Sequence, residues 1–247
     1  MTLRLFVDGP LHADAEFALG AGAARHAQVR RVQPGDALRL FDGSGGEWAA
    51  EVSAMTRSAV RVRLLHRVAI DLELPQAVTL AVGMPAGERM DWLVEKATEL
   101  GVASIQPLLC ERSVLRVQGE RAERKREHWQ AIAIAAAEQC GRTHVPKIAA
   151  VALFDDFVRR GAGAGAAARW MLSLRADATL PSPAQREGVM VVLSGPEGGL
   201  SEAEETLALA QHWRPLTLGP RVLRAETAPL ALLAWVGLVP QGDSATP

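Results

Sequence analysis

The chain has 247 residues, of which 49% are hydrophobic and 22% charged, and its formal net charge is −1 at pH 7. These values are typical of a globular protein with a sizeable core and exclude extensive disorder. They also exclude a surface that is positive overall, although a local basic patch for nucleic acid stays compatible with them. Two cysteines are too few for a disulfide framework or a cysteine-rich zinc site. We expect no metal.

Neither a targeting signal nor a membrane span is expected. The N-terminal residues lack the apolar segment and the small-residue cleavage site of a signal peptide. The longest uncharged apolar stretch, residues 228–240, is too short to span a bilayer. The sequence therefore predicts a soluble, cytoplasmic protein without a membrane partner.

Short strands are expected over residues 1–72. Four segments alternate apolar and polar residues between turn signals, and they cover residues 4–8, 36–43, 46–55 and 59–68. Strands at this spacing favour a small β-barrel or sandwich. No helical period is sustained in this domain, so we expect no long helix there.

Strands and helices alternate over residues 73–247. The expected strands cover residues 78–84, 102–109, 168–174, 188–195 and 215–219, and the helices cover residues 88–100, 120–140, 201–211 and a C-terminal apolar segment. Gly101 and Gly141 are placed to end two of the helices, and Ser201 with Glu204 fits a capping box. Such alternation predicts a second, α/β domain with a mostly parallel sheet.

Three segments lack the period of a helix or a strand. Residues 161–168 and 179–188 are expected to be loops inside the second domain, and residues 241–247 a frayed tail.

A glycine-rich turn follows the strand at residues 188–195. Gly195, Gly198 and Gly199 precede a helix N-terminus, where exposed backbone N–H groups suit a polar or anionic ligand. Its sequence, GPEGG, lacks the G-x-G-x-x-G of dinucleotide sites and the lysine of a Walker loop. Taken alone, the turn is equally consistent with a tight strand-to-helix connection that binds nothing.

A second Gly-Pro turn, LGPRVLRAETA at residues 218–228, has the same setting between a strand and a helix. We expect the two turns to end adjacent strands at one edge of the sheet, where open α/β sheets bind ligands. Arg224 and Glu226 are then either functional groups or a structural ion pair at the start of a buried helix. Arg221 is either a phosphate contact or a structural partner.

The segments LSGPEGGLSEAE and LGPRVLRAETA resemble those of the RsmE family of ribosomal RNA methyltransferases, in the SPOUT class. The resemblance covers nearly the whole chain and includes residues 25–52, 84–102, 105–113 and 133–146. The chain departs from it at Arg30-Arg31 and Ala225, where leucine-arginine and threonine are usual. The resemblance implies a PUA-like, RNA-binding barrel over residues 1–72 and a trefoil-knotted SPOUT α/β domain over residues 73–247, which binds S-adenosylmethionine (SAM) in the knot.

The resemblance implies a homodimeric enzyme that methylates N3 of a uridine in 16S rRNA on the assembled 30S subunit. Two alternatives stay open, a SPOUT methyltransferase with a different RNA target and a non-catalytic RNA-binding assembly factor. The intact glycine turns disfavour the assembly factor. The lack of a phosphate-loop lysine or a metal cluster disfavours a nucleotide-binding enzyme of another kind.

The resemblance assigns the SAM pocket to the two turns. The implied SAM-binding residues are Leu193, Ser194, Gly195, Pro196, Glu197, Gly198, Gly199, Leu218, Gly219, Pro220, Val222, Leu223, Arg224, Thr227 and Ala228. Uridine N3 must lose its proton to attack a methyl group. We therefore expect Arg224 to stabilise a negative uracil and Glu226 to accept the proton, as the two catalytic residues.

Basic side chains are the candidate phosphate contacts. RHAQVRR, at residues 25–31, is the better candidate, because the glutamates within residues 112–126 make a solvated helix face equally compatible there. The expected RNA-binding residues are Arg25, His26, Arg30, Arg31, Arg112, Glu138, Gln139, Arg142 and Arg221. An ordinary surface role is the alternative for His26, and a dimer contact is the alternative for Glu138, Gln139 and Arg142.

Overall fold

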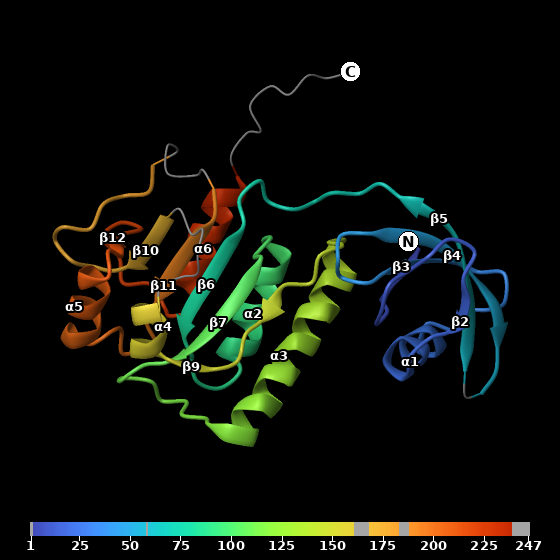
Figure 1. Cartoon of the computed structure of the whole chain (residues 1–247), viewed down its shortest axis with the longest axis horizontal. Coiled ribbons are helices and arrows are strands. Elements are labelled where there is room, and N and C mark those ends of the chain that lie inside the picture. Colours follow the sequence, from blue (N-terminus) through green and yellow to red (C-terminus); the bar gives the residue numbers. More distant parts are fainter. Residues whose placement is uncertain (1, 58, 161–167, 183–187, 239–247) are drawn as a thin grey trace, which may run out of the picture. The chain divides into compact units, whose positions relative to one another are not determined.

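The computed structural model describes residues 2–57, 59–160, 168–182 and 188–238 (Figure 1). The chain divides into two compact units, which we describe separately. Unit 1 consists of Met1–Glu73 and Ile134–Val145, and unit 2 of Leu74–Ala133 and Pro146–Pro247. A domain boundary between residues 72 and 73 stays a prediction, and nothing in the sequence pattern indicates that Ile134–Val145 belongs with unit 1.

A sheet with the order β1-β3-β4-β5-β2 forms the centre of unit 1. Its strands are β1 (Leu3–Phe6), β2 (Glu16–Ala18), β3 (Ala37–Phe41), β4 (Glu47–Met55) and β5 (Val60–Val68). β1 runs parallel to β3, and the other neighbours are antiparallel. The four strands predicted from alternation are all present, and β2 is an addition that the pattern did not indicate.

One helix packs against the core of unit 1 although the sequence pattern did not reveal it. α1 (Ala21–Val29) buries Ala24 and Ala27 against the same cluster as Leu5 and Val62. Alanines three positions apart lie on one face of a helix, but they give only a weak apolar signal. The lack of a sustained helical period therefore did not exclude a short helix.

Arg4 explains why residues 134–145 belong to unit 1. From β1, its guanidinium donates hydrogen bonds to the backbone oxygens of Ala137 at 2.8 Å, Glu138 at 3.0 Å and Arg142 at 3.1 Å, at the end of α3 (Gly119–Cys140). The last carbonyls of a helix have no partner within it, so a cation there satisfies them. Arg4 is itself paired with the buried carboxylate of Glu47 at 2.7 Å.

Unit 2 is built on a parallel sheet with the order β12-β10-β11-β6-β7-β8, and β9 also pairs with β7. The strands are β6 (Val78–Gly83), β7 (Ser104–Leu109), β8 (Lys147–Ile148), β9 (Ala152–Leu153), β10 (Ala168–Leu172), β11 (Met190–Ser194) and β12 (Arg214–Leu216). All five strands predicted for this region are present, and the mostly parallel sheet is confirmed. The short strands β8 and β9 were not predicted.

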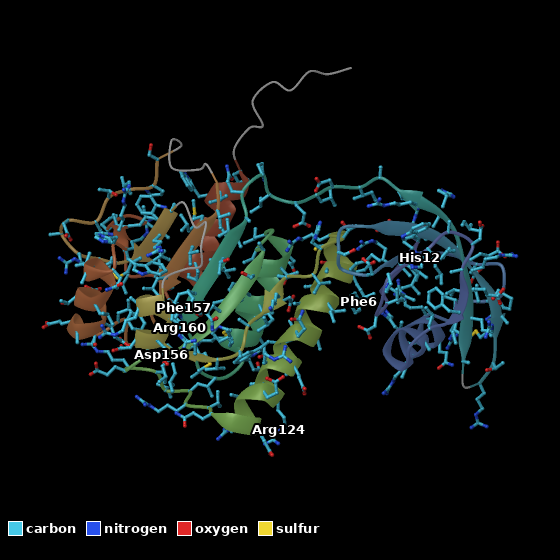
Figure 2. The ribbon with its side chains drawn as sticks, viewed as in Figure 1. Phe6, His12, Arg124, Asp156, Phe157 and Arg160 are labelled. Carbon is cyan, nitrogen blue, oxygen red and sulfur yellow. The ribbon has the colours of Figure 1, made fainter. Side chains whose placement is uncertain are left out.

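Helices cover the faces of this sheet (Figure 1). They are α2 (Arg89–Glu99), α3, α4 (Phe154–Arg160), α5 (Glu202–Ala210) and α6 (Thr227–Gly237). Leu193 of β11 packs in one cluster with Phe154 of α4 and Ala208 of α5. The alternate residue Val192 points to the opposite face because successive strand side chains alternate. Only α4 was not predicted, and Figure 2 labels three of its side chains, Asp156, Phe157 and Arg160.

The predicted helix ends are confirmed. Gly101 and Gly141 both have φ of +93°, the left-handed conformation that ends a helix. Ser201 caps α5, and the side chain of Glu204 accepts from the Ser201 N–H in return. Of the predicted loops at residues 161–168 and 179–188, residues 161–167 and 183–187 lie outside the described residues, as does the predicted tail, and Ala168 is the first residue of β10. Among the described residues, no helix is long and apolar enough to cross a membrane.

Candidate functional site

A cavity of about 670 Å³ opens in unit 2 where β10, β11 and β12 end. It is lined by Arg89, Leu172, Ser173, Leu174, Ser194, Gly195, Pro196, Glu197, Gly198, Gly199, Leu200, Glu205, Leu216, Leu218, Arg221, Val222, Leu223, Arg224, Ala225 and Ala228. The carboxyl edge of a parallel sheet is where such folds hold ligands. The volume lies within the range of about 300–1,000 Å³ that is usual for small-molecule sites.

The two predicted turns line this cavity together, but the expectation that they end adjacent strands is wrong. β10 lies between β11 and β12, and it pairs in parallel with both. Leu172, the last residue of β10, and Ser173 and Leu174 after it therefore enter the lining between the two turns. The prediction failed because closeness in sequence does not fix strand order when a third strand can insert.

The first turn is tight enough to require glycine. Gly199 donates its N–H to the carbonyl of Pro196 at 2.8 Å and has φ of +70°. A Cβ on Gly195 would lie 2.7 Å from the nitrogen of Leu200. At the end of β6, a Cβ on Gly83 would lie 2.5 Å from Cδ of Pro196. The glycines thus let backbone pack on backbone beside the cavity.

Glu197 anchors this turn to the segment before α2. Its Oε1 accepts hydrogen bonds from the Ala86 N–H at 2.8 Å and from Nη1 of Arg89 at 3.0 Å. Partial burial by itself raises the pKa of Glu197, but the bonds from Ala86 and Arg89 outweigh it and hold the pKa below its ordinary value. The carboxylate is therefore ionised at neutral pH, and the turn carries a fixed negative charge.

The second turn presents its charges in different ways. Arg224 is exposed and lines the cavity, as does Arg221. Glu226, directly before α6, is only 7% exposed, and its Oε2 has no hydrogen-bond partner. The structure therefore separates the two candidate catalytic residues, because Arg224 lines the cavity, whereas Glu226 is buried and is not among the lining residues.

Most of the predicted SAM-binding residues lie in the cavity wall, and four lie beside it. Leu193 is fully buried in β11, and Gly219, Pro220 and Thr227 flank lining residues of the second turn. The lining residues that the prediction missed are Arg89, Leu172, Ser173, Leu174, Leu200, Glu205, Leu216 and Ala225. Leu200 and Ala225 lie within the two turn segments that the resemblance used. The other six become visible as lining residues only from the strand order and from contacts between elements.

Glu205 adds a carboxylate to the cavity wall. It lies on α5, one turn beyond the capping Ser201, and its Oε1 accepts a hydrogen bond from Oγ of Ser173 at 3.1 Å. Nη1 of Arg175 lies 3.7 Å from its other oxygen. No pattern in the sequence singled this residue out, because its partner Ser173 follows a different strand.

The candidate RNA-binding residues of α1 and the turn after it differ in exposure. Arg25, Arg30 and Arg31 are exposed, on α1 and directly after it. Nδ1 of His26 lies 3.3 Å from a carboxylate oxygen of Glu138.

The remaining candidates of unit 1 lie at and after the end of α3. The other carboxylate oxygen of Glu138 accepts the N–H of Phe6 at 2.8 Å, and Gln139 is exposed. Arg142 is 3% exposed and paired with Glu73. It is therefore a structural residue of unit 1 and not accessible to RNA phosphates.

Arg112, the remaining candidate for RNA binding, is exposed, but its guanidinium contacts the first turn of the cavity. It lies after β7, and its Nη1 donates to the carbonyl oxygens of Gly198 at 3.0 Å and Leu200 at 3.1 Å. Its guanidinium thus binds the glycine turn.

Comparisons with known proteins match both parts of the chain. A family model described as an RNA methyltransferase domain matches residues 72–237, and one described as an RNA methyltransferase PUA domain matches residues 19–65. The ribosomal RNA small subunit methyltransferase E of a Synechocystis species is 35% identical over 96% of this chain and 77% of its own length. That of Bacillus subtilis is 32% identical over 84% of each chain.

A solved structure is similar over nearly the whole length. It is the crystal structure of a ribosomal RNA small subunit methyltransferase E from Neisseria gonorrhoeae bound to SAM. It is 32% identical in sequence, superposes with a TM-score of 0.87, and the match covers 95% of this chain and 96% of that one.

Proposed function

Because this chain belongs to the family of the ribosomal RNA small subunit methyltransferase E, we propose that it methylates N3 of a uridine in 16S rRNA. It is a SAM-dependent rRNA methyltransferase with a SPOUT-class α/β domain and a PUA-like N-terminal domain. The strand order is consistent with the trefoil knot of that class. The proposal further includes the assembled small subunit as substrate, a homodimer as the active form, and the cytoplasm, where ribosomes work, as the location.

The cavity formed by the two glycine turns is the observation that carries the proposal, because its lining fits SAM. The volume of about 670 Å³ accommodates a nucleoside-sized ligand. Leu172, Leu218 and Leu223 offer apolar surface for an adenine ring, and the tight first turn brings backbone groups close to the ligand. The Glu205 carboxylate offers an acceptor for hydroxyl or ammonium groups. When bound, SAM supplies a methyl group already activated by its sulfonium charge, so the transfer itself needs no metal.

Arg224 is our proposed stabiliser of the reacting base. Its guanidinium stays protonated throughout the accessible pH range, so it cannot take the N3 proton. Its exposed position at the cavity wall supports a role in stabilising the negative charge that develops on uracil as N3 loses its proton.

Glu226 is our proposed proton acceptor. Its Oε2 is buried without a hydrogen-bond partner two residues from Arg224, so this oxygen has capacity for a proton. If Glu226 were purely structural, a folded Glu226→Gln variant would keep wild-type turnover. We expect that variant instead to bind SAM and to lose most of its turnover.

The exposed arginines of unit 1 are our proposed phosphate contacts. Arg25, Arg30 and Arg31 are accessible to a polyanion, and Gln139 offers a further exposed polar group. Arg142 is left out of this set because it is buried and paired.

The test uses small-subunit particles from cells that lack this methylation. The particles are incubated with the protein and SAM labelled on its methyl group, and the RNA is then digested to nucleosides. Label in 3-methyluridine is the expected result. Label in another nucleoside would identify a SPOUT enzyme with a different target atom. An absence of label on particles and on free 16S rRNA, with SAM binding intact, would favour the non-catalytic assembly factor.

A further inference from the structure

Arg112 connects two segments that are not neighbours in the sheet. It follows β7, whereas the glycine turn follows β11, and β6 lies between these strands. Nη1 of Arg112 nevertheless donates to the oxygens of Gly198 and Leu200, at 3.0 and 3.1 Å. Both residues line the cavity. A single guanidinium nitrogen therefore holds two carbonyls of the cavity wall.

The two peptide groups held by Arg112 are each fixed at both ends. In the peptide after Gly198, Arg112 binds the carbonyl, and the N–H of Gly199 donates to Pro196 at 2.8 Å. In the peptide after Leu200, Arg112 binds the carbonyl, and the N–H of Ser201 donates to Oε2 of Glu204 at 2.8 Å. Because a peptide group is planar, fixing both ends sets the direction of the whole group.

A second connection joins the same two segments. Glu204 is 5% exposed, and its Oε1 accepts the N–H of Glu111 at 2.8 Å. Residues 111 and 112 are thus both hydrogen-bonded to the stretch from Gly198 to Glu204. A buried carboxylate needs hydrogen-bond donors, and Glu204 takes them from both segments, so it links them directly.

The aliphatic part of Arg112 packs against Gly198. A Cβ on Gly198 would lie 3.1 Å from Cβ and 3.4 Å from Cδ of Arg112. A side chain at residue 198 would therefore crowd Arg112 and push it away from the turn.

We propose that Arg112 is a positioning residue of the SAM pocket, which holds the glycine turn in its ligand-binding conformation. The proposal rests on the proposed function of the cavity. It assigns the Arg112 guanidinium to the turn and not to RNA phosphates. A turn held in place before the ligand arrives loses less conformational freedom on binding, so removing the clamp weakens SAM binding.

Two variants separate positioning from phosphate binding. Arg112→Met keeps the aliphatic length and removes the donors, whereas Arg112→Lys keeps the charge and loses the planar fork. Arg124→Met is the matched control, since this arginine, labelled in Figure 2, is 70% exposed on α3 and lies outside the cavity lining. SAM affinity is measured by calorimetry, small-subunit affinity at several salt concentrations, and KM for SAM separately from kcat.

For Arg112→Met we expect the Kd and KM for SAM to rise by about tenfold or more. This is the effect expected when hydrogen bonds from a charged group are lost. kcat at saturating SAM should change less, and small-subunit affinity with its salt dependence should stay as in wild type. Arg112→Lys should recover at most part of the SAM affinity. If Arg112→Met does not fold, Arg112→Lys is judged by the same criteria.

Unchanged SAM affinity in Arg112→Met, with small-subunit affinity lost there and retained in Arg112→Lys, would overturn the proposal in favour of a phosphate contact. A wild-type protein that binds no SAM would instead refute the proposed function of the cavity. The two failures are therefore distinguishable.

Discussion

Nη1 of Arg89 lies 3.0 Å from Oε1 of Glu197, so an ion pair joins the start of α2 to the glycine turn after β11. Both residues line the cavity. The same carboxylate oxygen also accepts the N–H of Ala86. The turn is thus held by side-chain contacts on two sides, from Glu197 toward α2 and from Arg112 toward β7.

We predict that Glu197→Gln weakens SAM binding by about three- to tenfold, because the charge-assisted bond to Arg89 becomes a neutral one. Glu127→Gln, an exposed carboxylate change on α3, is the control and should have no effect. Calorimetric titration with SAM measures both. Equal affinity in wild type and Glu197→Gln would show that the ion pair does not hold the pocket.

The wild-type protein should also show a pH dependence of defined sign. The pKa of Glu197 is lowered in the folded state from its ordinary value of 4.5. Its stabilising contribution is therefore fully present above pH 4.5 and is lost as the pH falls below that value through the folded-state pKa. Titration of Glu197 should leave SAM affinity unchanged between pH 7 and about pH 5. At lower pH, protonation of Glu197 should weaken SAM binding in the wild type, and this loss should be absent in Glu197→Gln.

Arg224→Ala should lower turnover far more than SAM affinity. The guanidinium acts on a charge that develops during the reaction, so its loss raises the barrier by about 3–4 kcal/mol, or roughly 10²- to 10³-fold in kcat. Arg124→Ala serves as the control. Single-turnover methylation of small subunits at saturating SAM measures the effect. Wild-type turnover in Arg224→Ala would eliminate the proposed role.

Cys110 should be unreactive in the native protein. Burial raises the pKa of its thiol to about 12, with a further contribution from the nearby Glu204 carboxylate. The reactive thiolate is therefore nearly absent at pH 8. With Cys140→Ser as background, a thiol reagent at pH 8 should modify the protein only after denaturant is added. Rapid labelling of native Cys140→Ser would contradict the burial of Cys110.

Gly83→Ala should destabilise unit 2 by about 1–3 kcal/mol through overpacking. Its Cβ would meet Pro196 backbone at 2.6 Å and Sγ of Cys110 at 2.9 Å. Gly22→Ala in the first turn of α1 is the contrasting control, because nothing lies within 4 Å of its Cβ position and alanine is a better helix former than glycine. Denaturant unfolding should move in opposite directions for the two variants, and equal shifts would refute the packing argument.

Arg4→Met should strongly destabilise unit 1. The Glu47 carboxylate, whose side chain is only 3% exposed, loses its closest cation in this variant. We expect the free energy of unfolding to fall by about 3–5 kcal/mol. Arg63→Met removes an exposed pair with Glu51 and should leave stability unchanged within error. The free energy of unfolding of both variants tests this. A small effect of Arg4→Met would mean that water replaces the lost partner.

The local elements of this protein follow from its sequence. Alternation over residues 46–55 and 59–68, the helical stripe of residues 88–100 and the capping pair Ser201 and Glu204 each depend on neighbours along the chain. Such signals depend on short stretches of sequence, and the structure contains each of the elements that they predicted. α1 was missed because its buried face consists of alanines, and α4 because it is short.

The identity of the two turns was also visible in the sequence. The residues GPEGG and LGPRVLRAETA predicted a ligand pocket, and both segments line one cavity. Their arrangement was not visible, because β10 inserts between β11 and β12. Strand order depends on how crossover connections wind around the sheet, which no local window records.

The sequence by itself determined most of the longer elements, the family resemblance and the two turns that line the cavity. Only the tertiary structure decided that Arg112 clamps the first turn, that Arg142 is buried against Glu73, and that Glu205 joins the cavity wall. The reason is physical. The local sequence around an arginine is the same whether its guanidinium contacts RNA or a backbone carbonyl. Its role depends on which distant segment the fold brings within hydrogen-bonding distance.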